Sequence, residues 1–320
     1  MTSRRIFLTA VAGALASTAR AQPARRIPTV GFLTLGGVDS LAQFRDAMRD
    51  FGYVEGRDLA IERRSSEGTV AVLPRLAAEL VQLNVDVIYA TGPAAVKAAH
   101  DATKRIPIVA LDLETDPVAS GMARSLGRPG GNVTGLFLDQ PALAGKWLEL
   151  LTEILPGRRR IAALWDVATG APQLTAARTA AKRFGVELRV LEFSTRDELV
   201  QRLGQASDGW TQAVMMLTSP IVSVNSTLIA EWTRRNRMPA ISPFRAFAEG
   251  GGLLSYGPDL VAFRRISAAY VDKILKGASV AELPVQQPTL FQLVVNQKTA
   301  KALGVAIPQS VLLRADEVIQ

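Results

Sequence analysis

Eleven residues of this 320-residue chain have types and positions that suit the binding of a small molecule. They lie at or shortly after predicted strand ends, or in a glycine-rich segment beside an expected cleft. They are Thr34, Thr91, Pro93, Ala94, Asp116, Trp165, Asp166, Thr218, Ser219, Arg245 and Tyr256. Hydroxyls and free N–H groups ahead of a helix favour an anionic group such as a carboxylate. The acids suit an ammonium group or sugar hydroxyls, so the set as a whole indicates capture of a polar ligand.

Two similar tripeptides are the most informative part of this set. Thr91-x-Pro93 and Thr218-x-Pro220 follow strands at equivalent positions in the two halves of the chain, and Ser219 lies within the second tripeptide. A single threonine ahead of a helix has a sufficient role as its cap. The paired placement favours a further role, in which both sets of hydroxyls face one ligand.

The acids nearest the expected cleft are Asp112, Glu114, Asp116 and Asp166. Of these we select Asp116 and Asp166 as ligand candidates, although an aspartate at a strand end also stabilises turns. Trp165 either stacks on a flat ligand or packs in the core. Tyr256 and Arg245 are candidates for the rim of the cleft, and the guanidinium of Arg245 suits a carboxylate.

The chain lacks the residues on which many enzyme and metal sites depend. It has no cysteine and one histidine, His100, so thiolate metal sites and a Ser-His-Asp triad are not expected. Thr34-Leu35-Gly36-Gly37 after the first strand departs from the G-x-G-x-x-G sequence of dinucleotide binding, and no P-loop or G-x-S-x-G motif occurs. We therefore expect neither catalysis nor a cofactor. Paired carboxylates for glycoside hydrolysis remain an open alternative.

The elements that must position these residues alternate between short apolar strands and helical patterns, which is typical of a parallel sheet covered by helices. The predicted strands are 28–35, 58–63, 86–90 and 107–111, then 160–165, 187–193, 213–217 and 239–241. Corresponding strands of the two sets are 126 to 132 residues apart. The sequence therefore predicts an α/β fold of two doubly wound parallel-sheet lobes. Ligands of such sheets bind beyond the carboxyl ends of the strands.

Three extended or glycine-rich segments are candidates for crossings between the lobes: Gly127–Gly135, Gly250–Gly257 and Phe291–Asn296. Clustered glycine and proline allow a crossing to bend, although they also occur in ordinary loops. We expect a hinge of about three crossings and a cleft between the lobes. The predicted N-terminal lobe is 28–132 plus 257–288, and the predicted C-terminal lobe is 133–256 plus 289–320.

Residues 1–21 are predicted to be an export signal cleaved near Ala21. Arg4-Arg5 precedes an apolar run of about eleven residues and the small-residue site Ala19-x-Ala21. Arg4-Arg5-Ile6-Phe7-Leu8 resembles a twin-arginine signal, while a general secretory signal and a membrane anchor are the alternatives. Cleavage removes three arginines and no acid, which lowers the formal net charge from +8 to +5. We expect a periplasmic protein that does not bind nucleic acid.

Seven linked motifs in order along the mature chain carry a family resemblance. They are Ile106-Pro107-Ile108-Val109, Thr115–Gly121, Arg128–Gly135, Phe247–Gly257, Tyr270–Gly277, Asn296–Gly304 and Arg314–Ile319. Together they resemble the ABC-transporter substrate-binding family that includes tryptophan and tyrosine binders. The resemblance implies a type I periplasmic binding-protein fold and delivery of a small solute to a membrane permease. Trp165-Asp166-Val167 stands where members often have Trp-Asn-Pro, so the ligand of those members is not carried over to this chain.

The predicted function is therefore solute binding for an ABC importer. The expected ligand is small and polar or zwitterionic, an amino acid or an aromatic carboxylate, held in the cleft of a monomer. One alternative is a sensor that presents its closed form to a receptor, and another is an exported hydrolase on a similar scaffold.

Overall fold

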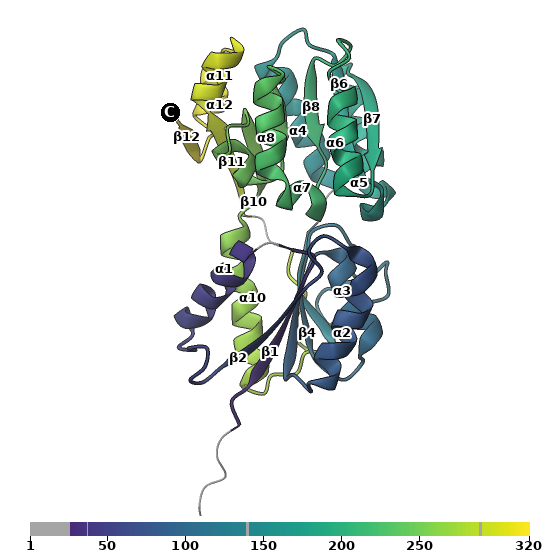
Figure 1. The fold of residues 1–320 in the computed structure, drawn as a ribbon, viewed down its shortest axis with the longest axis vertical. Helices are drawn as coiled ribbons and strands as arrows, with labels where there is room; N and C mark the ends of the chain where they lie inside the picture. The colour runs from purple at the N-terminus through teal and green to yellow at the C-terminus, as the bar shows by residue number, and fades with distance from the viewer. Residues whose placement is uncertain (1–25, 37, 139–140, 288–289) are drawn as a thin grey trace, which may run out of the picture.

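The computed structural model describes residues 26–36, 38–138, 141–287 and 290–320, which form two α/β lobes placed end to end (Figure 1). Each lobe is built on its own sheet, of five strands in the first lobe and seven in the second. The predicted export signal lies outside the described residues. No helix in the described ranges is long and apolar enough to cross a membrane.

The first lobe has an entirely parallel sheet in the order β2-β1-β3-β4-β5. Its strands are β1 (Thr29–Thr34), β2 (Ala60–Ser65), β3 (Val87–Thr91), β4 (Ile108–Asp112) and β5 (Val133–Phe137). One face is covered by α1 (Val38–Asp50) and α10 (Leu260–Leu275), and the other by η1 (Val70–Val72), α2 (Leu73–Gln82) and α3 (Pro93–Ala102) (Figure 1). Because both faces are covered, β4 and β5 are buried along their whole length, as parallel strands require.

The second lobe has the strand order β12-β11-β10-β9-β8-β6-β7. Its strands are β6 (Arg160–Asp166), β7 (Glu187–Phe193), β8 (Ala213–Met216), β9 (Ala240–Ser242), β10 (Leu254–Pro258), β11 (Phe291–Asn296) and β12 (Glu317–Ile319). Its helices are α4 (Pro141–Ile154), η2 (Val167–Thr169), α5 (Ala171–Phe184), α6 (Arg196–Gln205), α7 (Pro220–Val224), α8 (Ser226–Arg235), α9 (Arg245–Glu249), α11 (Gln297–Leu303) and α12 (Gln309–Leu312). Neighbouring strands are parallel except β10 and β11, which are antiparallel.

Local sequence fixes where several of these helices begin and end. The side chain of Asp259 accepts the N–H groups of Val261 and Ala262 and so caps the start of α10. Thr195 caps α6 in the same way. At the other end, Gly185 adopts the left-handed conformation that terminates α5.

The predicted boundary between residues 132 and 133 is wrong. Val133–Phe137 is strand β5, which pairs in parallel with β4 and completes the first sheet. The outer edge of β5 is also covered, since the Phe137 N–H donates to the Gln286 carbonyl and the Gln286 N–H to the Gly135 carbonyl. The glycine-rich segment 127–135 therefore leads into a buried strand of the first lobe rather than across to the second.

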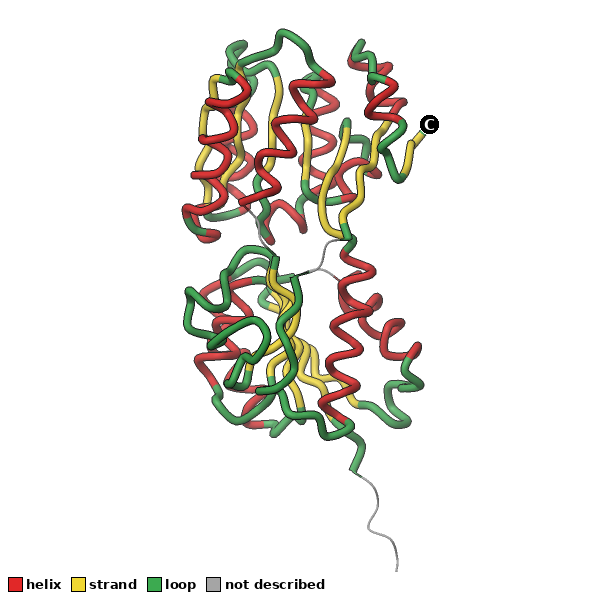
Figure 2. The backbone as a smooth tube through the Cα atoms, turned by 180° about the vertical axis from the view of Figure 1, so that it is seen from behind, coloured by secondary structure: helices red, strands yellow, loops and turns green. Residues whose placement is uncertain are grey.

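The chain passes between the lobes at three places, in agreement with the predicted number of crossings. It leaves the first lobe after β5 and enters α4, returns between Pro258 of β10 and Leu260 of α10, and leaves again before β11. Figure 2 shows α10 beginning at the junction and running down the first lobe. Residues 257 and 258, predicted for the first lobe, lie in β10 of the second sheet.

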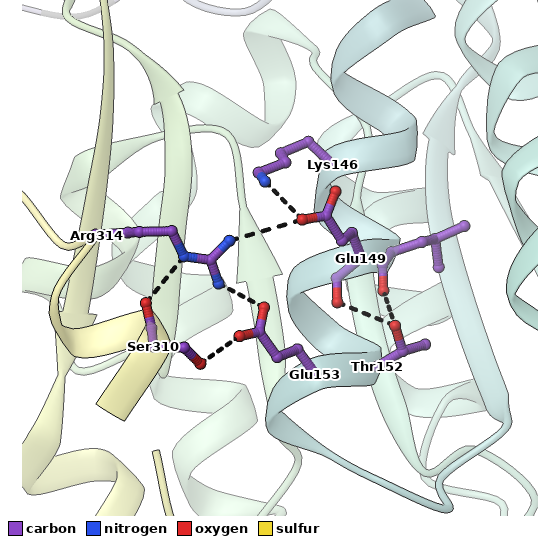
Figure 3. A network of polar contacts seen from close by, with 7 residues as sticks. Lys146, Glu149, Thr152, Glu153, Ser310 and Arg314 are labelled. Atoms are coloured by element: carbon purple, nitrogen blue, oxygen red, sulfur yellow. Dashed lines mark hydrogen bonds and ion pairs between the residues drawn. The ribbon is translucent and has the colours of Figure 1, made fainter. Parts of the chain in front are cut away.

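A polar network attaches the C-terminal segment to the second lobe (Figure 3). Arg314, which follows α12, pairs with Glu153 at 2.5 Å and with Glu149 at 3.7 Å, both on α4. The Ser310 hydroxyl donates to Glu153 at 2.7 Å, and Lys146 pairs with Glu149 at 2.6 Å. Ion pairs that are linked in a network contribute more to stability than isolated ion pairs on the surface do.

Gly135→Ala is expected to destabilise the first lobe. Gly135 has φ +124°, and an added Cβ would lie 2.2 Å from the carbonyl oxygen of Ala110 on β4. Strain and overpacking of this kind cost about 3 kcal/mol together. A melt followed by circular dichroism should show a clear fall in Tm for this variant. Gly127→Ala is the control, since an added Cβ there meets no atom within 4 Å. Equal Tm values for the two variants would contradict the assignment of β5.

Candidate functional site

A cavity lies between the two lobes, and we call it the central cavity. Its first-lobe walls are Thr34, Leu35, Gly36, Ser40, Thr91, Gly92, Leu111, Leu113 and Glu114, together with Leu260 and Arg264 of α10. Its second-lobe walls are Pro220, Ser223, Val224 and Phe244. Figure 1 shows α7, which carries Pro220 and Ser223, on the side of the second lobe that faces the first. The mixture of apolar walls with a few polar groups suits a small molecule.

The strand ends place two predicted threonines at the floor of the central cavity. Thr34 ends β1 and Thr91 ends the neighbouring β3, so parallel pairing brings them together. The Thr91 hydroxyl donates to the Thr34 hydroxyl oxygen at 2.9 Å, and the Thr34 hydroxyl donates to the Gly36 carbonyl at 3.0 Å. This chain of hydrogen bonds orients both hydroxyls at the lobe surface.

The lobes touch beside these threonines. Gly92 has φ +86°, and an added Cβ there would lie 3.4 Å from Cγ of Pro220 in the second lobe. Gly92 of the first tripeptide and Pro220 of the second are therefore neighbours across the two lobes. The contact closes one side of the central cavity.

Glu114 is the acid that lines the central cavity. Removal from water raises the pKa of its carboxyl well above the usual 4.5, and the negative charges of Asp112 and Asp166 raise it further. Asp112 is fully buried, and its Oδ1 accepts the N–H groups of Glu114 and Thr115 at 3.0 Å. Its other oxygen, Oδ2, has no hydrogen-bond partner among the described residues, and burial raises the pKa of Asp112.

Asp166 approaches the same region from the second lobe. It ends β6 and is 2% exposed. Its Oδ2 accepts the Ser219 hydroxyl proton at 2.6 Å and its Oδ1 accepts the Ala168 N–H. Burial raises the pKa of Asp166, while the hydrogen bond from Ser219 opposes this shift. The carboxyl thus joins the end of β6 to the start of α7.

A second space between the lobes lies on the side of α3, and we call it the α3-side cavity. Pro93, Ala94 and Asp166, all predicted candidates, line it together with Lys97 and His100. Leu35 and Pro220 line both this α3-side cavity and the central one. The two spaces therefore adjoin across the contact between the lobes.

Six other candidates have different surroundings. Ser219 is fully buried against Asp166, and the Thr218 main chain bonds to the Gln173 amide. Arg245 pairs with Glu249 and Glu317 beside a third opening between the lobes. Asp116 is exposed, and its carboxylate accepts the N–H groups of Val118 and Ala119. The Trp165 indole N–H donates to the Gly170 carbonyl. The Tyr256 ring stacks on the Phe291 ring, with 5.9 Å between the ring centres. None of these last three side chains lines the central cavity.

Several lining residues were missing from the sequence prediction. Glu114 comes two residues after the end of strand β4, so the sequence indicated that it lies near the cleft. No local pattern showed that Glu114, rather than Asp116, would line the cavity. Phe244 comes shortly after β9 and is 4% exposed. Leu260 and Arg264 lie on α10, which follows a crossing, and no nearby motif indicates that they return to the site. Arg264 donates to the Gln43 side chain at 2.5 Å and to the Leu260 carbonyl.

The described residues contain no group of three or more acids or histidines arranged to hold a metal ion. The polar groups of the central cavity can instead donate to a carboxylate, through Arg264 and the Ser223 hydroxyl, and accept from an ammonium group, through Glu114.

Comparisons with known proteins identify a family. A family model described as ABC transporter substrate binding protein matches residues 37–319. A tyrosine-binding protein of Clostridioides difficile is 26% identical over 266 residues, which cover 81% of this chain and 75% of that protein.

Solved structures agree with the predicted two-lobed α/β fold, which is confirmed. An ABC domain from Streptococcus pneumoniae in complex with L-Trp has a TM-score of 0.82 at 23% identity, covering 91% of this chain and 99% of that one. A conserved domain protein from Vibrio cholerae has a TM-score of 0.83 at 26% identity, covering 92% and 100%.

Glu114→Gln is expected to stabilise the ligand-free protein at neutral pH. Because the folded state holds the pKa of Glu114 above 4.5, it binds more protons than the unfolded state between that value and the raised pKa. The free energy of unfolding therefore falls as the pH rises through this range, and the amide removes the fall. Melts should place the Tm of the variant about 1–3 °C above the wild type at pH 8, and equal to it near pH 4. A lower Tm at pH 8 would contradict the burial of a charged Glu114.

Ser219→Ala is expected to destabilise the second lobe by about 1–3 kcal/mol. It removes the cap of α7 and leaves a buried Asp166 oxygen without this donor. Chemical denaturation measures the loss. Ser207→Ala is the control, because Ser207 is exposed and makes a hydrogen bond on the surface. A loss no larger than that of the control would show that the Asp166–Ser219 bond contributes little.

Proposed function

Because this chain belongs to the ABC transporter substrate-binding protein family, we propose that its central cavity captures a small polar or zwitterionic ligand for a membrane permease. The family consists of extracytoplasmic binding proteins rather than enzymes. Within it, the ligand class that best suits this chain is an amino acid or an aromatic carboxylate. The observation that carries this proposal is the lining of the central cavity, which combines apolar walls from both lobes with a few polar groups.

The apolar part of the cavity supports a ligand with a sizeable nonpolar side chain. Leu35 and Leu113 of the first lobe face Val224 and Phe244 of the second. An aromatic ring between such walls gains burial on both faces and contact with the Phe244 ring. The relatives named for tyrosine and in complex with L-Trp bind molecules of this type.

The polar part supports a charged or zwitterionic main body. Arg264 suits a carboxylate, and the hydroxyl of Ser223 provides a further donor from the second lobe. With apolar walls between them, these groups would fix the orientation of the ligand as well as its identity.

Closure of the lobes is the mechanism that follows from this arrangement. A ligand contacts both sets of walls only when the lobes are together, so binding favours the closed state. Residues of the first sheet with α10 would move as one body, and residues of the second sheet as the other, about the three crossings. Transfer to a permease would then require the reverse opening.

Export is the remaining part of the proposal. We propose that residues 1–21 direct the chain to the periplasm through a twin-arginine-like or general secretory signal and are removed near Ala21. The mature protein would act as a monomer, without nucleic acid or a cofactor. Mass spectrometry of the protein recovered from the periplasm would identify its first residue.

Val224→Glu is expected to lower the affinity for L-tyrosine and L-tryptophan at least tenfold. Val224 is 49% exposed, so the substitution leaves the packing of α7 intact but places a charge on an apolar wall of the cavity. Isothermal titration calorimetry measures the affinity. Val200→Glu is a matched control, because Val200 is a 45% exposed valine on α6 outside the central cavity. Equal affinities in the two variants would place the ligand elsewhere.

A further inference from the structure

Three carboxyl groups from both lobes meet near the central cavity. Asp112 ends β4 and Glu114 lies in the loop after it in the first lobe, and Asp166 ends β6 in the second. Asp112 is fully buried with Oδ2 unpartnered, and Glu114 lines the cavity next to it. We propose that Glu114 binds a positively charged amino group of the ligand, so the protein selects amine-bearing ligands over aromatic carboxylates that lack one.

The protein itself supplies little positive charge to this cluster. In the described ranges, no lysine or arginine is among the groups that shift the pKa of Glu114 or Asp112, whereas Asp166 is satisfied by Ser219 and a main-chain N–H. Arg264 lines the same cavity from α10, where its guanidinium donates to Gln43. A buried carboxylate without a cation is costly, and a ligand ammonium would remove that cost.

The neighbours of Glu114 strengthen its preference for a cation. Asp112 and Asp166 add negative charge around it, as the direction of its pKa shift indicates. Asp112 also acts as a positioning residue, since its Oδ1 accepts the main-chain N–H groups of Glu114 and Thr115 and holds the loop in place. A carboxylate group of a ligand placed beside these acids would be repelled, so it must lie at the opposite side of the cavity, toward Arg264.

This inference rests on the proposed function, because it names the chemical class of ligand for the same cavity. It separates the two ligand classes of the proposed function. An amino acid pairs its ammonium group with the half-buried Glu114 carboxylate, whereas an aromatic carboxylate without an amino group leaves Glu114 without a cation. The expected loss for the second class is about 10- to 150-fold in affinity, the range for a hydrogen bond to a charged group.

The experiment compares six compounds with the full protein by calorimetry and thermal shift. They are L-tyrosine and L-tryptophan, their counterparts without the amino group, 3-(4-hydroxyphenyl)propionate and indole-3-propionate, and their counterparts without the carboxylate, tyramine and tryptamine. We expect the two amino acids to bind most tightly and the two propionates to bind at least tenfold more weakly.

Glu114→Gln tests the residue itself. It should lower the affinity for the amino acids by about 10- to 150-fold and leave the weak affinity for the propionates unchanged or improved. Glu187→Gln is the matched control, because Glu187 is an exposed acid at the start of β7, remote from the strand ends that line the cavity. Asp112→Asn should reduce the affinity for the amino acids less than Glu114→Gln does.

The pH profile is a readout that a purely structural role would not change. The amino group requires Glu114 as the carboxylate, so affinity for L-tyrosine should fall as the pH drops through the raised pKa of Glu114. Asp112, Asp166 and Arg264 are the other charged groups near it, and Lys97, His100 and Asp101 of α3 face the adjoining cavity. The profile should flatten in Glu114→Gln and persist in His100→Gln, since burial already lowers the pKa of His100.

The outcomes separate the two proposals. If the propionates bind the wild-type protein as tightly as the amino acids, or if Glu114→Gln keeps full affinity and the same pH profile, the role of Glu114 is overturned while ligand capture in the cleft stands. If none of the six compounds binds the wild-type protein, the ligand class of the proposed function fails, and the role of Glu114 fails with it.

Discussion

Burial of carboxyl groups between two lobes is the constraint on which the properties of this protein depend. Parallel sheets bring strand ends to one edge, and here the edges of two sheets face each other. Gly92 of the first lobe and Pro220 of the second lie next to each other across the space between these edges. Glu114 and Asp112 lose hydration in this arrangement, so the closed state contains an electrostatic cost that a suitable ligand can relieve. Selectivity and closure then have the same physical origin.

The rest of the molecule serves to hold these edges in place. In chain order, α10 is the last helix of the first lobe, and the chain reaches it by a crossing from the second lobe. It packs on the first sheet and contributes Leu260 and Arg264 to the central cavity. In the second lobe the Arg314 network fixes the C-terminal segment to α4. Each lobe can then move as one rigid body, because α10 packs on the first sheet and the C-terminal segment is bonded to the second lobe.

Agreement between sequence and structure is best where the signal is local. Thr34 and Thr91 were predicted from strand ends alone, and parallel pairing places them 2.9 Å apart, oxygen to oxygen. Asp116 looked equivalent to Glu114, two residues earlier, yet one carboxylate closes a turn and the other lines the cavity. Segment 127–135 looked like a hinge because of its glycines. Its last three residues pair with β4, and Gly135 also bonds to residue 286, about 150 positions away, so the segment ends in the buried sheet of the first lobe.

The sequence by itself determined the two α/β units and the strand ends at which a ligand would bind, because hydrophobic periodicity and strand termini are properties of neighbouring residues. The tertiary structure decided which of those ends face each other, which acid loses its water and which distant helix completes the walls. Burial and electrostatic interaction depend on groups brought together from far apart in the chain. No local pattern records that proximity.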